Sequence, residues 1–118
     1  MEIITVLLII FIVLFAMNRF MPVKGVETLT PEETKKKFKE KNVQLIDVRT
    51  SREYETHHLK PFKNIPLANL PDKLHTLDKE KEVVLLCQSG MRSGQAAKLL
   101  KKHGFEKVSH VGGGINAF

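Results

Sequence analysis

The stretch VVLLCQSGMRSGQAAKLLKKHGF, residues 83–105, decides the fold. Its first five residues are apolar without alternation, which is typical of a strand buried on both faces of a parallel sheet. From Arg92 onward, small and apolar residues recur at helical spacing with lysines opposite them, and Gly104 ends the pattern. The stretch therefore predicts a buried strand, a short loop that begins at Cys87, and an amphipathic helix.

The same alternation of strands and helices extends to both sides of this stretch. Strands are expected at 43–48, 64–67 and 108–111, and helices at about 31–41 and 68–77, with a short helix after Thr50. Four or five strands that alternate with helices predict an α/β fold: an open, mostly parallel sheet with helices on both faces. Ligands of such sheets bind outside the carboxyl ends of the strands, where Cys87 lies.

The length of the chain allows one folded domain, and its single cysteine agrees with a reducing compartment. It has 118 residues, a formal net charge of +6 and one cysteine, so no disulfide can form within it. A secreted domain of this size would usually carry an even set of cysteines. The positive charge could attract anionic lipid, nucleic acid or small anions, but no basic motif with interleaved aromatic residues predicts nucleic-acid binding.

The N-terminus is strongly apolar. Ile3 to Met17 is apolar except at Thr5, and extension to Met21 gives about 19 residues, or roughly 28 Å of helix. We expect one transmembrane helix that anchors the chain through residues 3–21, with an anchor and linker at 1–23 and the folded domain at 24–118. A cleaved signal peptide and a buried core helix are alternatives, but the segment lacks a basic start and a small-residue cleavage site.

The flanking charges predict the orientation of this anchor. Only Glu2 precedes the apolar segment, whereas Arg19, Lys24 and a lysine run at 35–37 follow it. Because positive residues stay on the cytoplasmic side, we expect a single-pass protein of the cell membrane with its N-terminus outside and its domain in the cytoplasm.

The loop after Cys87 has features that activate a thiol. A helix N-terminus, a ring of backbone N–H groups and a nearby arginine each favour the thiolate. Gly90 allows a backbone turn that other residues resist, and Arg92 follows close by. A buried, inert cysteine at a strand end is equally compatible with the spacing alone.

Three stretches resemble a known family: LIDVRTSREYETHHLKPFKNIPL (45–67), residues 83–105, and VGGGINAF (111–118). They look like a single-domain rhodanese, a sulfurtransferase homology domain, and the loop matches that family's Cys-x-x-Gly-x-Arg-Ser pattern. The resemblance implies that Cys87 takes a sulfane sulfur from a donor such as thiosulfate as a persulfide and passes it to a thiol or cyanide. It implies no cofactor and no metal. The implied substrate-binding residues are Gln88, Ser89, Gly90, Met91, Arg92 and Ser93.

Two rival functions stay open. One is a catalytically silent module tethered to the membrane, and the other is a cysteine-dependent phosphatase or arsenate reductase on a related fold. Only four residues separate Cys87 from Arg92, which predicts a loop too tight for phosphate. Uncharged Gln88 and Ser89, where some thiosulfate-using relatives have basic residues, weaken the case for thiosulfate as the physiological donor.

Other polar residues favour structural roles. Asp47 and Arg49 match the family's Asp-Val-Arg stretch, but we expect a hydrogen-bonded carboxylate and an ion pair, with Glu53 as a possible partner. Adjacent His57 and His58 diverge on any regular element, and without a second cysteine they do not predict a zinc site.

Overall fold

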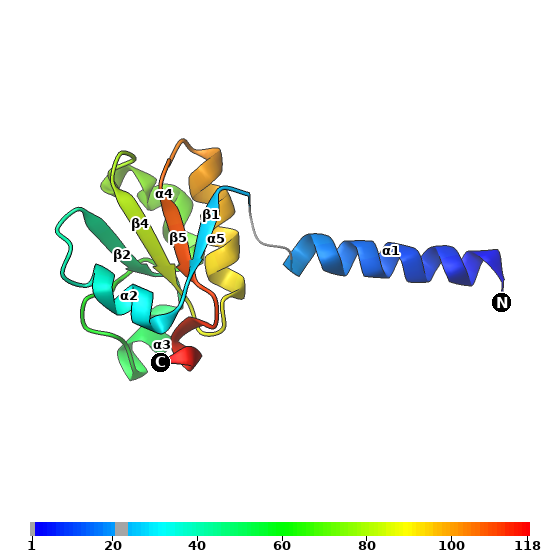
Figure 1. Ribbon diagram of the computed structural model, residues 1–118, viewed down its shortest axis with the longest axis horizontal. Helices are drawn as coiled ribbons and strands as arrows, with labels where there is room; N and C mark the ends of the chain where they lie inside the picture. Colours follow the sequence, from blue (N-terminus) through cyan, green and yellow to red (C-terminus); the bar gives the residue numbers. More distant parts are fainter. Residues whose placement is uncertain (1, 21–23) are drawn as a thin grey trace.

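The fold is built on one five-stranded parallel sheet, in a computed structural model that describes residues 2–20 and 24–118. The strand order is β1-β5-β4-β2-β3, and β4 lies at the centre (Figure 1). This confirms the expected open parallel sheet. The strands are β1 (Val26–Leu29), β2 (Val43–Asp47), β3 (Lys63–Asn64), β4 (Glu82–Leu86) and β5 (Val108–Val111).

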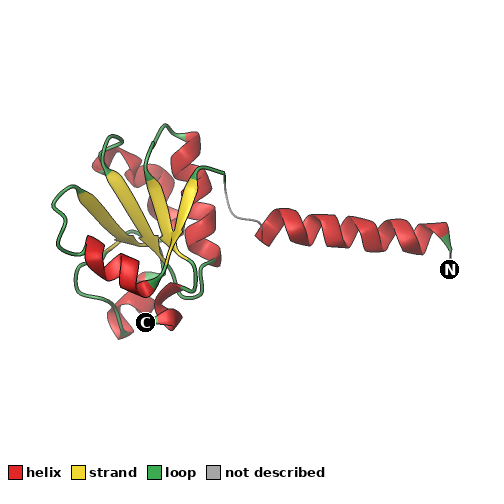
Figure 2. Cartoon of the chain, viewed as in Figure 1, coloured by secondary structure: helices red, strands yellow, loops and turns green. Residues whose placement is uncertain are grey.

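Helices cover both faces of the sheet, as expected (Figure 2). Side chains alternate across each strand, so β4 sends Val83 and Leu85 to one face and Val84 and Leu86 to the other. The first pair packs under α4 and α5, and the second packs on the side of α2. The helices are α1 (Ile3–Phe20), α2 (Pro31–Lys37), α3 (Ser51–Thr56), α4 (Leu70–Lys73) and α5 (Met91–Lys102), with 3-10 turns η1 (Leu67–Asn69), η2 (Leu74–Thr76) and η3 (Gly114–Ala117).

Local sequence signals explain where the helices begin and end. Thr30 and Thr50 each accept a hydrogen bond from the backbone N–H three residues on, and a glutamate returns the contact, so both α2 and α3 carry capping boxes. Beyond α5, Gly104 takes a left-handed φ of 90°, which stops the helix as predicted.

One strand was not predicted, and three predicted elements differ in extent. The unpredicted strand is β1, whose four residues are half exposed at a sheet edge and carry little apolar pattern. β3 is only Lys63–Asn64 rather than 64–67, and α2 ends at Lys37 rather than near residue 41. The helix expected at about 68–77 is broken into η1, α4 and η2.

The expected transmembrane helix is not supported. Within the residues that the structure describes, no helix is both long and apolar enough to cross a membrane. The last residue of the expected span, Met21, and the linker residues up to Val23 lie outside the described residues.

Candidate active site

Cys87 lies at the carboxyl end of the central strand. It directly follows β4, and its side chain is 1% exposed within the core that α4 and α5 cover. The parallel sheet places this end of β4 between the ends of β2 and β5. The thiol is therefore held on a rigid element, as the sequence predicted.

The loop turns back over the sulfur. The backbone N–H of Gly90 donates a hydrogen bond to Cys87 Sγ at 2.9 Å, and Ser93 Oγ lies 3.4 Å from the same sulfur. Gly90 has a φ of 105°, and a Cβ there would lie 2.1 Å from the Gly112 carbonyl oxygen. Only glycine fits this position, for reasons of both backbone conformation and space.

The segment after β5 closes the site from the other side. The N–H of Ile115 donates to the Cys87 carbonyl at 2.8 Å, and the N–H of Asn116 donates to the Gln88 carbonyl at 3.2 Å. A Cβ on Gly114 would lie 2.5 Å from both of these carbonyl oxygens. The segment after the glycine run at 112–114 therefore supports the Cys87 loop.

Arg92 is engaged by an acidic residue. Its two terminal nitrogens donate to Glu53 Oε1 at 2.5 Å and Oε2 at 2.9 Å. The hydrogen bond from Arg92 is the main cause that lowers the pKa of Glu53 to about 2, and the same bond raises the pKa of Arg92. Arg92 as a binder of anionic substrates stays a prediction, and a donor would have to share the guanidinium with Glu53.

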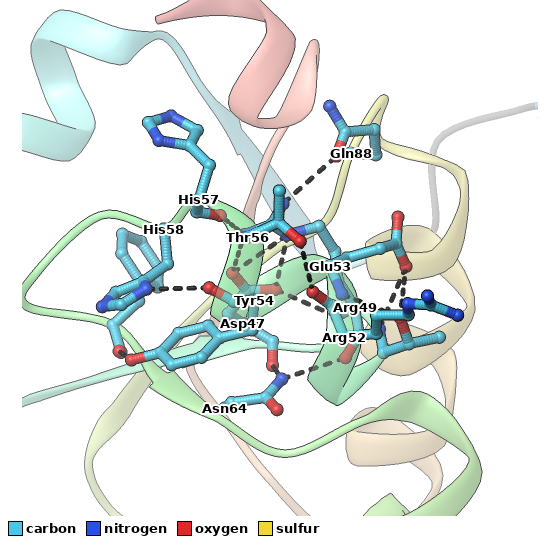
Figure 3. Close-up of polar contacts among 12 residues, drawn as sticks. Asp47, Arg49, Arg52, Glu53, Tyr54, Thr56, His57, His58, Asn64 and Gln88 are labelled. Atoms are coloured by element: carbon cyan, nitrogen blue, oxygen red, sulfur yellow. Dashed lines mark hydrogen bonds and ion pairs between the residues drawn. The ribbon is translucent and has the colours of Figure 1, made fainter.

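A second ion pair lies below the loop (Figure 3). Arg49 donates to both carboxylate oxygens of Asp47 at 2.9–3.1 Å, and both side chains are almost fully buried. The structural role expected for these residues fits this geometry, but Glu53 was the wrong partner because it pairs with Arg92. Arg49 also donates to Gln88 Oε1 at 3.2 Å, so the pair fixes the loop.

An open pocket of about 440 Å³ lies beside Gln88. Polar and charged residues line it, Glu53 among them, but most of the surface that they present to the pocket is apolar. Its lining residues are Arg49, Thr50, Arg52, Glu53, Thr56, His57 and Gln88.

The remaining loop residues face outward. Ser89 is exposed, and Met91 is 51% exposed although it is apolar. The side chains of His57 and His58 diverge as expected (Figure 3), and the His58 ring stacks on Tyr54. The structure thus brings together Cys87, Gly90 and Ser93 around the sulfur and leaves Ser89 and Met91 at the rim.

Known proteins are similar to this chain in sequence and fold. The rhodanese-like domain family matches residues 30–118. The putative sulfurtransferase YtwF of Bacillus subtilis is 37% identical over 93 residues, which are 79% of this chain and 88% of that protein. The putative sulfur carrier protein YrkF of the same organism is 36% identical, over 69% of this chain but only 46% of its own length.

A solved structure agrees. The crystal structure of a rhodanese-like domain protein from Staphylococcus aureus superposes with a TM-score of 0.71 at 33% identity, covering 77% of this chain and 89% of that one. The family match spans most of the chain, and the parallel sheet and the Cys87 loop occupy the matched region. This chain belongs to the rhodanese-like domain family.

Proposed function

We propose that this protein is a sulfurtransferase in which Cys87 carries a sulfane sulfur as a persulfide. The observation that carries the proposal is the Cys87 sulfur itself, buried at the end of β4 and hydrogen-bonded by the Gly90 amide at 2.9 Å. The names of two relatives, a putative sulfurtransferase and a putative sulfur carrier protein, support sulfur transfer in general.

The first half-reaction loads the sulfur. The Cys87 thiolate attacks the outer sulfur of a donor, the bond between that sulfur and the rest of the donor breaks, and the leaving group keeps the electron pair. With thiosulfate the leaving group is sulfite. The enzyme then holds a Cys87 persulfide anion, and no external oxidant or reductant takes part.

The second half-reaction unloads it. An acceptor thiolate or cyanide attacks the outer persulfide sulfur, and the Cys87 thiolate leaves with its electron pair. A thiol acceptor becomes a persulfide, and cyanide becomes thiocyanate. Because Cys87 is the only cysteine, no second thiol of the chain can attack the persulfide, and the sulfur waits for an external acceptor.

The loop stabilises the anion in both states. The Gly90 amide donates to the thiolate, and further loop amides between Gln88 and Arg92 are proposed to contact the outer sulfur once it is bound. Thiosulfate and cyanide are proposed as one donor and one acceptor.

Phosphatase chemistry is less well supported. The four residues between Cys87 and Arg92 form a short loop, and its turn at Gly90 is already packed against Gly112. The guanidinium that would have to hold a phosphate is paired with Glu53. A persulfide adds only one atom, so it needs less room.

We also propose that the chain works at the cytoplasmic face of the cell membrane. The support is α1, which exposes large apolar side chains such as Ile3 at 76%, together with the basic residues that follow it. The proposal is that the chain associates with the membrane, and it does not require α1 to cross the bilayer. Cell fractionation should find the full chain, but not a version without residues 1–23, with the membranes; recovery of the full chain in the membrane-free fraction would contradict it.

A turnover assay tests the catalytic proposal. With thiosulfate and cyanide, or with thiosulfate and a small thiol, the wild type should show ping-pong kinetics and Cys87→Ser should be inactive. His75→Gln, at an exposed residue of η2, should retain activity. The silent-module alternative predicts no turnover with any donor, and the phosphatase alternative predicts release of phosphate from an aryl phosphate.

A further inference from the structure

A chain of polar side chains connects the Cys87 sulfur with the surface. Sγ lies 3.4 Å from Ser93 Oγ, and this oxygen lies 2.9 Å from Nδ1 of His110. Nε2 of the same ring lies 3.5 Å from Oγ1 of Thr28, an exposed residue. A thiol, a hydroxyl and an imidazole are therefore in sequential contact from the buried sulfur outward.

The fold places these groups together from separate elements. Parallel pairing of β1 with β5 sets Thr28 beside His110. Side chains two residues apart on a strand share a face, so His110 lies on the same face as Val108, which packs in the core beneath α5. Ser93 is buried in the first turn of α5. His110 lies outside the loop pattern that defines the family resemblance.

The imidazole is suited to accept a proton. Burial lowers the pKa of His110 below its ordinary value of 6.5, so the ring is neutral at neutral pH and has one nitrogen without a hydrogen. The same burial makes the ring a weaker base, so proton transfer also requires the attraction between the imidazolium and the thiolate that form together. The groups that face it are the hydroxyls of Thr28 and Ser93, and its register partner on β4 is Leu85. Its one titratable neighbour along this chain of contacts is Cys87.

Ser93 can pass a proton in either direction. Its hydroxyl has two acceptors within reach, Nδ1 of His110 at 2.9 Å and the Gly90 carbonyl at 3.1 Å. While it donates to His110, its oxygen is free to accept the Cys87 S–H. If the ring becomes protonated, Nδ1–H donates to the Ser93 oxygen, and the hydroxyl hydrogen is free to turn to the sulfur.

We propose that Ser93 and His110 form a proton relay that generates the Cys87 thiolate. The S–H bond breaks and its electron pair stays on sulfur. The thiol proton moves to Ser93 Oγ while the original Ser93 proton moves to Nδ1 of His110. The neutral thiol and imidazole become a thiolate and an imidazolium, and total charge is unchanged. The Nδ1–H of His110 then donates to Ser93 Oγ, and the Ser93 hydroxyl donates to the sulfur. Both hydrogen bonds stabilise the negative charge of the thiolate.

This inference deepens the proposed function, because it rests on Cys87 as the nucleophile. His110 acts through Ser93 and is a positioning and proton-accepting residue. A purely structural His110 would only orient Ser93, and an asparagine could do that equally well. The two roles therefore differ in what happens when the ring is replaced by an amide that hydrogen-bonds but does not titrate.

The experiment measures the thiolate directly. Because the chain has one cysteine, the ultraviolet absorbance of its thiolate, read against Cys87→Ser as blank, reports Cys87 alone. We compare the full chain with His110→Asn across pH. The titration midpoint of His110→Asn should lie about one pH unit above that of the wild type, which is a tenfold lower ratio of thiolate to thiol at a given pH. Near pH 10 both should reach the same amplitude, because solvent then removes the proton.

Control variants distinguish loss of the proton relay from general damage to the fold. His103→Gln, at an exposed histidine whose ring hydrogen-bonds the Leu99 carbonyl of its own helix, should leave the titration unchanged. Ser93→Ala should shift the midpoint as His110→Asn does, and the double variant should shift it no further. An unchanged midpoint in His110→Asn, or additive shifts in the double variant, would overturn the relay. No sulfur donor is present, so the result stands even if sulfur transfer itself fails.

Discussion

Arg92 and Glu53 hold each other through two parallel hydrogen bonds, at 2.5 and 2.9 Å, and so join the start of α5 to α3. Glu53 is also the glutamate of the α3 capping box, where its Oε1 accepts from the Thr50 N–H at 3.1 Å. One carboxylate thus fixes a helix start and the arginine of the active-site loop. The loop is positioned by a residue that lies 39 positions earlier in the chain.

Glu53→Gln should weaken this link in a pH-dependent way. The folded state lowers the pKa of Glu53 from 4.5 to about 2, so its stabilisation is present above about pH 4.5 and is lost as the pH falls toward 2. Because the pair is about one-third exposed, we expect a loss of only about 1 kcal/mol in the free energy of unfolding at neutral pH. Urea unfolding of both proteins at several pH values measures this, and a difference that persists at pH 2 would contradict the assignment.

Much of the fold was predictable because its signals are local. The apolar run of β4 and the glycine stop after α5 depend on neighbours in sequence, and both are confirmed. The capping boxes of α2 and α3 are local in the same way. β1 was missed because a short, half-exposed edge strand is stabilised mainly by pairing with β5, a partner about 80 residues away.

The candidate site was predictable only in part. The resemblance supplied Cys87 and its loop, but the Arg92–Glu53 pair and the support from Gly114 depend on contacts between distant segments, which no spacing rule shows. His110 could have been found: the alternation of VSHV places it on the face of Val108, and β5 adjoins the strand that ends at Cys87. The transmembrane span expected for residues 3–21 is not supported within the described part of the chain, and its last residue lies outside that part.

Gly90→Ala should destabilise the domain. The added Cβ would meet the Gly112 carbonyl oxygen at 2.1 Å, and alanine disfavours a φ of 105°, so we expect a loss of more than about 2 kcal/mol. Gly94→Ala is the matched control, because it adds a Cβ to the same helix with nothing within 4 Å, and it should gain about 0.5–1 kcal/mol. Thermal and urea unfolding measure both. Equal effects of the two substitutions would contradict the packing described here.

Asp47→Ala should be among the most damaging substitutions. It leaves the Arg49 guanidinium buried without its carboxylate, which costs about 3–5 kcal/mol. Asp78→Ala removes an ion pair whose two side chains are about half exposed, with Lys81 at 4.0 Å, and should cost less than about 1 kcal/mol. Denaturant unfolding distinguishes them, and similar losses for both would show that the Arg49 pair is not a buried structural contact.

Arg92→Ala should discriminate between donors. If the guanidinium contributes to binding anions, sulfur uptake from thiosulfate should slow more than uptake from a neutral organic trisulfide. Stopped-flow measurement of Cys87 loading with both donors checks this. Equal slowing would assign Arg92 to loop positioning through Glu53 rather than to donor binding.

The central claim, that Cys87 carries the sulfur, is tested most directly by the intact mass of the protein after incubation with donor and removal of excess reagent. Because no second cysteine can attack the persulfide, the loaded form should accumulate when acceptor is withheld. The wild type should gain the mass of one sulfur atom and lose it again on addition of a thiol or cyanide, while Cys87→Ser gains nothing. A wild type that gains no sulfur from any sulfane donor, or a Cys87→Ser variant that gains as much as the wild type, would contradict the account.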